Sequence, residues 1–152
     1  MNQTTHPDAD PALAQLATGV DIVHIPRIAK LIDEPGQHSP GQHSPGQHFL
    51  DKVFTTAEQA TCAGNPERLA ARWAAKEATI KALGLHIADI DLRDIEVISA
   101  EGAPPRLALH GSADEAAKRL GPGVISLSLA HDGDYAIAFV VSTSSTRAIK
   151  PR

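Results

Sequence analysis

Cysteine and aromatic residues are scarce in this sequence of 152 residues. The single cysteine, Cys62, excludes an internal disulfide framework and is typical of a reducing compartment. Aromatic residues make up 3% of the chain and hydrophobic residues 42%. Alanine, leucine, isoleucine and valine must therefore fill the core, and the length is sufficient for one domain with a core of its own.

Positive net charge and long apolar runs are also missing. The formal net charge of −4 argues against general nucleic-acid binding. No apolar run reaches the length that a membrane-spanning helix needs, and we find no signal peptide. We therefore expect a soluble, cytoplasmic protein. No residue beside Cys62 would activate its thiol, so this cysteine is expected to be a packed small residue.

A long helix is predicted over residues 65–84. Asn65 can cap its N-terminus, Pro66 fits the first helical position, and Gly84 suits a left-handed C-cap. About 18 residues at ~1.5 Å rise give a rod of ~27 Å, which is long enough to cross a small domain. Many alanines keep this rod thin, so that other backbones or a ligand can come close.

Four charged side chains lie among these alanines: Arg72, Lys76, Glu77 and Lys81. One interpretation is a solvated helix face, on which Glu77 and Lys81 form a favourable i,i+4 pair. The other is a cation-rich surface for phosphates, with one carboxylate that could hold a metal. Spacing alone leaves both interpretations open.

A strand with an unusual aspartate is predicted over residues 16–25. Asp21 lies inside this apolar run, where aspartate is disfavoured. It either faces water at an edge or bulge, or it is a carboxylate held in a cleft for a cation. A short helix follows over residues 26–32, with Arg27 and Lys30 on its outer side.

Residues 35–48 form a tandem repeat, PGQHS-PGQHS-PGQH. Proline and glycine at every fifth position oppose a continuous helix or a central strand, so we predict a flexible surface insertion. Its equally spaced histidines, His38, His43 and His48, could catch a soft metal adventitiously but do not make a dedicated site.

Capping boxes and alternating residues predict the remaining elements. Thr55 with Glu58 and Ser112 with Glu115 have capping-box spacing, so each pair predicts the start of a helix. Alternation predicts strands over residues 94–99 and 106–110, and a hairpin over residues 124–131 and 135–141 that turns at Asp132 and Gly133.

These elements predict an α+β fold in which a mostly antiparallel sheet packs on the one long helix. A single domain is expected over residues 15–143, with the repeat insertion at 35–48. Residues 1–14 and 144–152 are predicted to be flexible tails.

Four blocks of the sequence then carry a resemblance to a known family. They are GVDIVHIPR, FTTAEQ, AARWAAKEATIKALG and SLSLAHDGDYAIAFV, in this order over about residues 19–141. Apart from the repeat insertion, this stretch resembles the holo-acyl-carrier-protein synthases, which are small 4'-phosphopantetheinyl transferases. The KEAxxKA core at residues 76–82 is the most specific part of the match.

The resemblance implies the 4'-phosphopantetheinyl transferase fold and its reaction. Such enzymes move 4'-phosphopantetheine from coenzyme A to a serine of an apo acyl carrier protein or carrier domain, and release adenosine 3',5'-bisphosphate. Asp21 and Glu77 match the family's Mg²⁺-binding carboxylates, as the usual ligands of Mg²⁺ would suggest. Lys81 would add a cation on the same pyrophosphate of coenzyme A.

The resemblance leaves other roles open. Arg72 and Lys76 are candidates for contacts with other phosphates of coenzyme A, and His131 matches a histidine expected to contact coenzyme A. The base that deprotonates the carrier serine is a metal-bound water, Asp21 or Glu77 through such a water, or His131.

The resemblance also implies partners. Arg27 matches a position on the partner-facing helix and Lys30 lies nearby, so an acidic carrier is expected to dock there. Family members are typically homotrimers with each site between neighbouring protomers. Two other interpretations remain, namely a non-catalytic module that binds coenzyme A or a nucleotide, and an interaction protein whose basic helix is merely solvated.

Overall fold

The computed structural model describes residues 15–33, 44–100, 102–121 and 123–144. The predicted tails lie outside these residues, except that Ser144 ends a strand. The strands are β1 (Gln15–His24), β2 (Ile95–Ile98), β3 (Arg106–Leu109), β4 (Ile125–Asp132) and β5 (Tyr135–Ser144). The helices are α1 (Ile25–Ile32), α2 (Pro45–Val53), α3 (Thr56–Cys62), α4 (Pro66–Ala82) and α5 (Gly111–Arg119), with short 3-10 turns η1 (Ile87–Asp89) and η2 (Leu92–Asp94).

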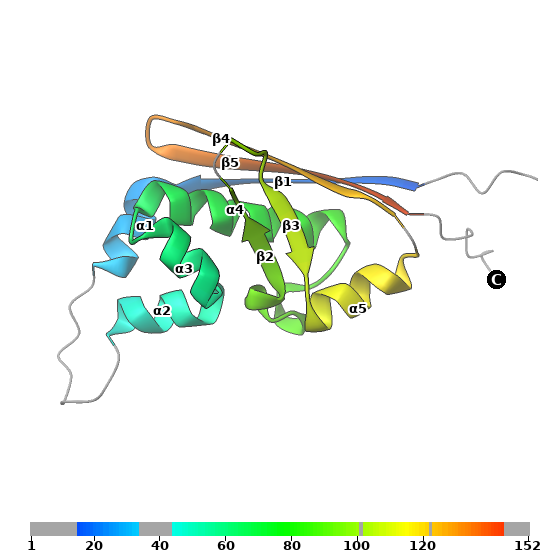
Figure 1. Ribbon diagram of the computed structural model, residues 1–152, viewed down its shortest axis with the longest axis horizontal. Coiled ribbons are helices and arrows are strands. Elements are labelled where there is room, and N and C mark those ends of the chain that lie inside the picture. Colours follow the sequence, from blue (N-terminus) through cyan, green and yellow to red (C-terminus); the bar gives the residue numbers. More distant parts are fainter. Residues whose placement is uncertain (1–14, 34–43, 101, 122, 145–152) are drawn as a thin grey trace, which may run out of the picture.

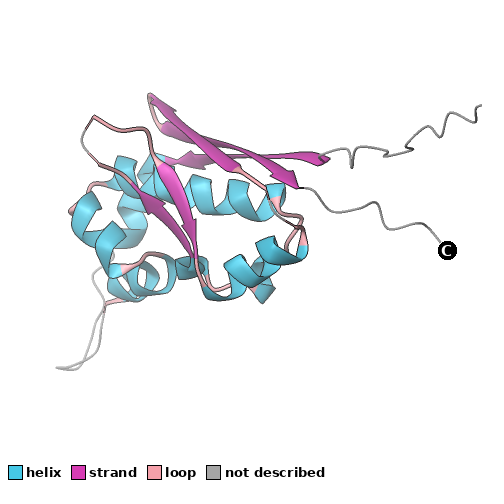
Figure 2. Cartoon of the chain, turned by 45° about the vertical axis from the view of Figure 1, so that its right-hand side comes forward, coloured by secondary structure: helices cyan, strands magenta, loops and turns pink. Residues whose placement is uncertain are grey.

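The strands form two antiparallel sheets around α4. The first has the order β1-β5-β4 and the second pairs β2 with β3. One face of the three-stranded sheet lies on α4, and the shorter helices lie on the side of α4 away from it (Figures 1 and 2). This arrangement confirms the predicted α+β fold with an antiparallel sheet packed on one long helix.

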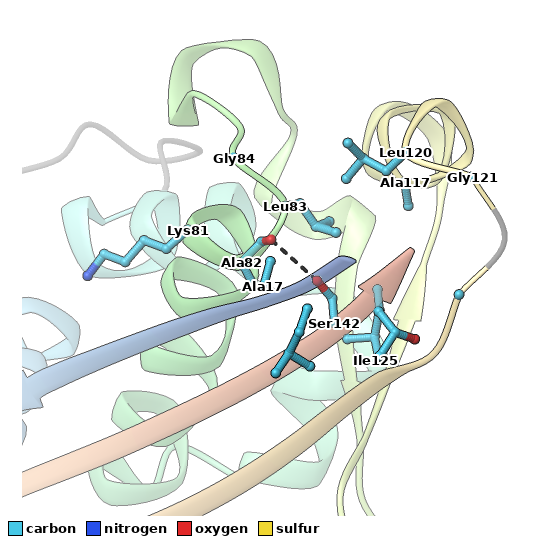
Figure 3. A pocket seen from close by; sticks show the side chains of 13 residues that line it. Ala17, Lys81, Ala82, Leu83, Gly84, Ala117, Leu120, Gly121, Ile125 and Ser142 are labelled. Carbon is cyan, nitrogen blue, oxygen red and sulfur yellow. Dashed lines mark hydrogen bonds between the residues drawn. The ribbon is translucent and has the colours of Figure 1, made fainter. Parts of the chain in front are cut away.

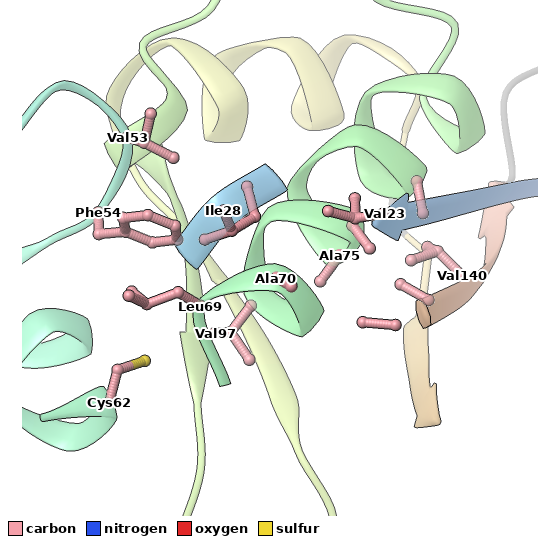
Figure 4. Packing of buried hydrophobic residues seen from close by; sticks show 14 of the residues in the cluster. Val23, Ile28, Val53, Phe54, Cys62, Leu69, Ala70, Ala75, Val97 and Val140 are labelled. Atoms are coloured by element: carbon pink, nitrogen blue, oxygen red, sulfur yellow. The ribbon is translucent and has the colours of Figure 1, made fainter. Parts of the chain in front are cut away.

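Small residues build the interface between α4 and the sheet. Ala70, Ala74, Ala75 and Ala78 are fully buried, and strand residues such as Val140 pack near them (Figure 4). The ends of α4 follow the sequence prediction, because Asn65 accepts a hydrogen bond from the Arg68 amide and Pro66 opens the helix. A core rich in alanine brings the strands close to the helix axis.

Gly19 is the point of closest approach between β1 and α4. A Cβ placed at this glycine would lie 1.9 Å from the carbonyl oxygen of Ala78 and 2.8 Å from the amide nitrogen of Ala82. No side chain fits there without moving the strand. Gly19 therefore sets the distance between β1 and α4, and with it the position of Asp21 two residues later.

The third copy of the repeat corrects the sequence prediction. The insertion was predicted to span residues 35–48, yet Pro45 opens α2, and the Ser44 side chain accepts a hydrogen bond from the Gln47 amide at 3.1 Å. Proline is tolerated at the first helical position, and serine is a good N-cap. A Cβ at Gly46 would lie 2.5 Å from the Ile32 carbonyl oxygen, so α2 packs closely on the end of α1.

The two predicted capping boxes have different outcomes. Thr55 and Glu58 form both hydrogen bonds of a capping box at the start of α3. The box predicted from Ser112 is wrong, because α5 begins at Gly111 and the Ser112 hydroxyl donates to Asp94 instead. The β4–β5 turn lies at residues 133–134, one residue later than predicted.

Candidate functional site

Asp21, Glu77 and Lys81 meet where β1 crosses the second half of α4. The Lys81 ammonium lies 2.7 Å from the Asp21 carboxylate and donates to the Val20 carbonyl oxygen at 3.0 Å. Glu77 precedes Lys81 by one helical turn, so both side chains lie on the same face of α4. The Asp21 side chain is 18% exposed and that of Lys81 is 50% exposed, so a ligand can reach both.

The two carboxylates influence each other. Burial raises the pKa of Glu77 above its usual range, the nearby charge of Asp21 raises it further, and Lys81 lowers it. Two carboxylates held together against their repulsion need a cation to offset their charge. Lys81 supplies part of that charge in this structure.

The carboxylate pair fits a magnesium ion. Mg²⁺ prefers oxygen ligands and is commonly held by one or two carboxylates, with substrate phosphates and water completing its octahedron. Among the described residues no group of three or more histidine, cysteine, aspartate or glutamate side chains could hold a metal by itself. Asp21 and Glu77 therefore supply the partial ligand set that is typical of Mg²⁺ bound together with a phosphate substrate.

A cavity of about 660 Å³ opens beside this pair. Its lining includes Asp21 and Glu77, basic Arg27 on α1, and the aromatic rings of Phe49 and Trp73. These two rings stack with centroids 5.2 Å apart. The cavity thus has a charged end and an apolar wall, as a ligand with a phosphate and an uncharged arm would require.

Sequence reasoning missed Trp73 and three other lining residues as parts of a site. Phe49, His24 and Tyr135 all line the cavity, and the rings of His24 and Tyr135 lie 5.2 Å apart. The His24–Tyr135 contact follows from the register of β1 against β5, which a single sequence does not specify. Phe49 follows the repeat directly, and no pattern in the sequence marks it as part of a site.

Lys76 lies in the interior, which corrects its predicted role. Its side chain is 1% exposed, and its ammonium donates to Glu58 at 2.8 Å and to the Leu92 carbonyl oxygen at 3.0 Å. It also donates to the Ile95 carbonyl oxygen. Burial lowers the pKa of Lys76, while Glu58 opposes that shift. This ammonium is not available to a phosphate of coenzyme A.

Arg72 is buried as well, and its predicted contact with coenzyme A is corrected in the same way. The residue is 5% exposed, and its guanidinium donates to the Arg68 carbonyl oxygen and to the Ser99 hydroxyl, both at 3.2 Å. Its Nε has no hydrogen-bond partner. Arg72 lies on the side of α4 that faces β2 rather than on the face of Glu77.

His131 lies away from the carboxylate pair in this chain. Its Nε2 is 2.9 Å from the carboxylate of Glu67, and both side chains are largely exposed. Glu67 and Glu77 are ten residues apart on α4, roughly 15 Å along the helix axis. Within one chain, His131 therefore lies too far from Asp21 and Glu77 to contact a ligand that binds between them.

A second cavity, of about 320 Å³, lies at the C-terminal end of α4 (Figure 3). Leu83, Leu120 and Ile125 line it, and the nearby Ser142 hydroxyl donates to the Ala82 carbonyl oxygen at 3.3 Å. Lys81 is the one charged residue among the described residues that line it, and its side chain extends away from the other labelled side chains. The apolar lining makes this cavity unsuited to a phosphate.

Comparisons with known proteins identify the family of this chain. The model of the 4'-phosphopantetheinyl transferase superfamily matches residues 17–140. The chain is 42% identical over 133 residues to the holo-[acyl-carrier-protein] synthase of Herpetosiphon aurantiacus, covering 83% of this chain and 97% of that protein. It is 40% identical over 126 residues to the synthase of Gloeobacter violaceus, covering 80% and 88% of the two proteins.

Solved structures show the same similarity. The ACPS–coenzyme A complex of Chronobacterium ammoniagenes has a TM-score of 0.70 at 30% identity, and the match covers 86% of this chain and 98% of that one. The Helicobacter pylori holo-[acyl-carrier-protein] synthase in complex with coenzyme A has a TM-score of 0.67 at 27% identity, covering 82% and 98%. The chain that carries Asp21, Glu77 and Lys81 in this arrangement belongs to the 4'-phosphopantetheinyl transferase superfamily.

Proposed function

We propose that this chain transfers 4'-phosphopantetheine from coenzyme A to a serine of an apo acyl carrier protein or carrier domain. The observation that carries the proposal is the convergence of Asp21, Glu77 and Lys81 at the mouth of a cavity with an apolar wall. In the reaction the serine oxygen bonds to the phosphorus that bears pantetheine. The phosphorus–oxygen bond to adenosine 3',5'-bisphosphate breaks, and that nucleotide leaves with the electron pair.

The charged residues have separate tasks in this proposal. Asp21 and Glu77 would hold Mg²⁺, which would supply positive charge to offset that of the pyrophosphate. Lys81 contributes its ammonium to the same pyrophosphate, since its contact with Asp21 places it beside the carboxylate pair. Phe49 and Trp73 line the path of the uncharged pantetheine arm.

The proton of the carrier serine goes to a carboxylate of the pair, directly or through a water. Asp21 and Glu77 both line the cavity, so either carboxylate can take this role within one protomer. His131 would reach that group only where a second copy brings its β4–β5 turn to the site, because its own chain places it beside Glu67.

We propose that the carrier docks on α1. Arg27 and Lys30 are exposed on this helix, and Arg27 also lines the cavity that holds the carboxylate pair. An acidic carrier would be guided to the cavity mouth by these cations. Arg27→Glu is expected to raise the KM for the carrier at least ~10-fold while the KM for coenzyme A stays within ~2-fold. Lys118→Glu, on distant α5, is the matched control.

We further propose a homotrimer, as in the family that the sequence resembles. Exposed apolar side chains on the outer face of the three-stranded sheet support self-association. Val20 pairs with Phe139 and Ile22 pairs with Ile137 across β1 and β5, and these side chains are 39–59% exposed. Contiguous apolar surface of this kind marks an interaction site.

A cytoplasmic location completes the proposal. The single thiol, Cys62, is buried, and burial raises its pKa, so it suits a compartment that keeps cysteine reduced. Across the described ranges, every helix is too short or too polar to cross a lipid bilayer.

The test is the intact mass of an apo acyl carrier protein after incubation with the chain, coenzyme A and Mg²⁺. A gain of one phosphopantetheine group that a chelator abolishes is the expected result. Asp21→Asn and Glu77→Gln should each lower the transfer rate at least ~10²-fold with circular dichroism unchanged. Binding of coenzyme A without transfer to any of several carriers would instead identify a non-catalytic binding module.

A further inference from the structure

The interior of the molecule contains a charged pair that the proposed reaction does not use. Lys76 on α4 and Glu58 on α3 are each 1% exposed, and their charged groups lie 2.8 Å apart. Burying two charges is costly unless further hydrogen bonds complete the pair. A neutral apolar pair could fill the same space, so stability alone does not explain these two residues.

Further hydrogen bonds engage both charged groups of the pair. The Glu58 carboxylate accepts from Lys76, from the Thr55 amide at 2.9 Å and from the Val97 amide at 3.0 Å. The Lys76 ammonium also donates to the carbonyl oxygens of Leu92 and Ile95, which begin and follow η2. The pair therefore joins α4 to the start of α3 and to β2.

Lys76 and Glu77 are consecutive residues whose side chains leave α4 in different directions. One residue of an α-helix turns through about 100°. The inward side chain, Lys76, is bonded to the α3–β2 side, while Glu77 faces Asp21 on β1. Among the described residues no hydrogen bond holds the Glu77 carboxylate itself, so its direction follows the rotation of the helix.

We infer that Lys76 is a positioning residue for the transfer reaction, because its buried pair with Glu58 fixes the rotation of α4 that turns Glu77 toward Asp21. This inference rests on the proposed function. It replaces the phosphate contact predicted from the sequence with a structural link of one residue to the metal-binding carboxylate. Loss of the Lys76–Glu58 pair should therefore lower the rate of the metal-dependent steps. It should have less effect on the affinity for those parts of coenzyme A that do not contact the metal.

The experiment compares wild type with Lys76→Met, Glu58→Gln, the double variant and the control Lys118→Met, an exposed lysine paired with Asp114 on α5. The single Lys76→Met variant leaves a buried carboxylate unpaired and should lower the Tm by ~10 °C. The double variant has no buried charge left, and its Tm should return to within ~3 °C of wild type. Lys118→Met should match wild type throughout.

Function is then measured in the double variant at its restored stability. We expect kcat at least ~10-fold below wild type, a higher Mg²⁺ concentration for half-maximal rate, and a KM for coenzyme A within ~2-fold. Independently of turnover, the rise in Tm caused by coenzyme A with Mg²⁺ should fall to less than about half of the wild-type rise. Wild-type kcat and a wild-type rise in Tm would overturn the inference and leave the pair a purely structural one.

Two further outcomes are separable. If the double variant does not fold, Glu58→Gln decides, because Lys76 keeps its two carbonyl acceptors there: a reduced kcat and a reduced ligand-induced rise in Tm support positioning, and unchanged values refute it. If wild type itself transfers nothing to any carrier, the proposed function fails, whatever the variants do to the Tm.

Discussion

Glu77 is held where burial and a second carboxylate both oppose its ionisation. Functional sites often hold a charged side chain in an unfavourable environment in the free protein, because a bound ligand can remove the unfavourable interaction. The unfavourable electrostatic environment of Glu77 thus indicates a functional site, as does the position of this residue in the sequence.

The raised pKa of Glu77 predicts how stability depends on pH. Between the ordinary pKa of a glutamate and the raised value, the folded state binds more protons than the unfolded state, so the free energy of unfolding falls as pH increases through that window. The Glu77→Gln variant has no ionisable group at this position, so it should not lose this part of its stability as the pH increases. Without metal it should have a Tm equal to or above wild type at neutral pH, together with the loss of transfer proposed above.

Thermal unfolding from about pH 4 to pH 8, with a chelator present, measures this effect. Glu115→Gln, an exposed residue of α5, is the matched control and should leave both the Tm and the transfer rate unchanged. A Glu77→Gln protein clearly less stable than wild type at neutral pH would contradict the assignment of a strained carboxylate.

The close approach of β1 to α4 at Gly19 leads to a second prediction about a single residue. Gly19→Ala forces β1 away from the Ala78 carbonyl oxygen, so the free energy of unfolding should fall by about 1–3 kcal/mol or more. The same shift displaces Asp21, so the transfer rate should fall further than stability explains. Urea unfolding and the mass assay measure the two effects, with exposed Thr18→Ala as control. Wild-type stability in Gly19→Ala would refute the close packing.

The helix elements show where a single sequence is informative. The ends of α4 and the capping box of α3 were predictable because a cap acts within one turn, and Asn65, Pro66 and Thr55 carry that signal locally. The β4–β5 hairpin was predictable because its alternation is regular. The family resemblance led to Asp21, Glu77 and Lys81, which the fold does bring together.

The errors arise from long-range contacts. Lys76 and Arg72 looked like surface cations because helical spacing does not report that Glu58, Ser99 and two carbonyl oxygens lie opposite them. The start of α2 inside the repeat depends on Gly46 packing against α1, which composition cannot reveal. Local signals therefore predicted the elements, whereas partners distant in the sequence decided which charges are buried.

The repeat allows a sharp test of how α2 begins. Deleting residues 35–39 leaves the sequence Ser-Pro-Gly-Gln-His in front of Phe49, so the N-cap serine and the Tm should be unchanged. Deleting residues 35–44 places Glu34 at the cap instead. That deletion should lower the free energy of unfolding by about 1 kcal/mol, the usual value of a lost serine cap.

Chemical denaturation of the two deletions measures the difference. Both should retain transfer activity, because Asp21, Glu77 and Lys81, to which we assign the reaction, lie on β1 and α4. Equal stability of the two proteins would show that Ser44 does not contribute to α2. A loss of transfer with an unchanged Tm would place part of the insertion against a substrate.

At the scale of the whole molecule, the outer face of the three-stranded sheet predicts the oligomer. Phe139→Lys places a charge in the middle of the apolar face and should reduce the mass measured by light scattering from that of a trimer toward that of a monomer. Ile98→Lys is the matched control, because Ile98 is 49% exposed but belongs to the other sheet. A wild-type chain that is already monomeric would refute the trimer.

The register of the first and last strands has a consequence for synthesis. Gln15 pairs with Ser144, and β5 is the one strand partner of β1 within the described residues (Figure 1). The strand that carries Asp21 leaves the ribosome first, yet it must wait for the final residues of the domain before it can pair. A circular permutant that joins residue 144 to residue 15 through a short linker, and opens the chain within the repeat insertion, would make β1 directly after β5. In the natural order, by contrast, a nascent chain holds an incomplete site until translation of the domain has ended.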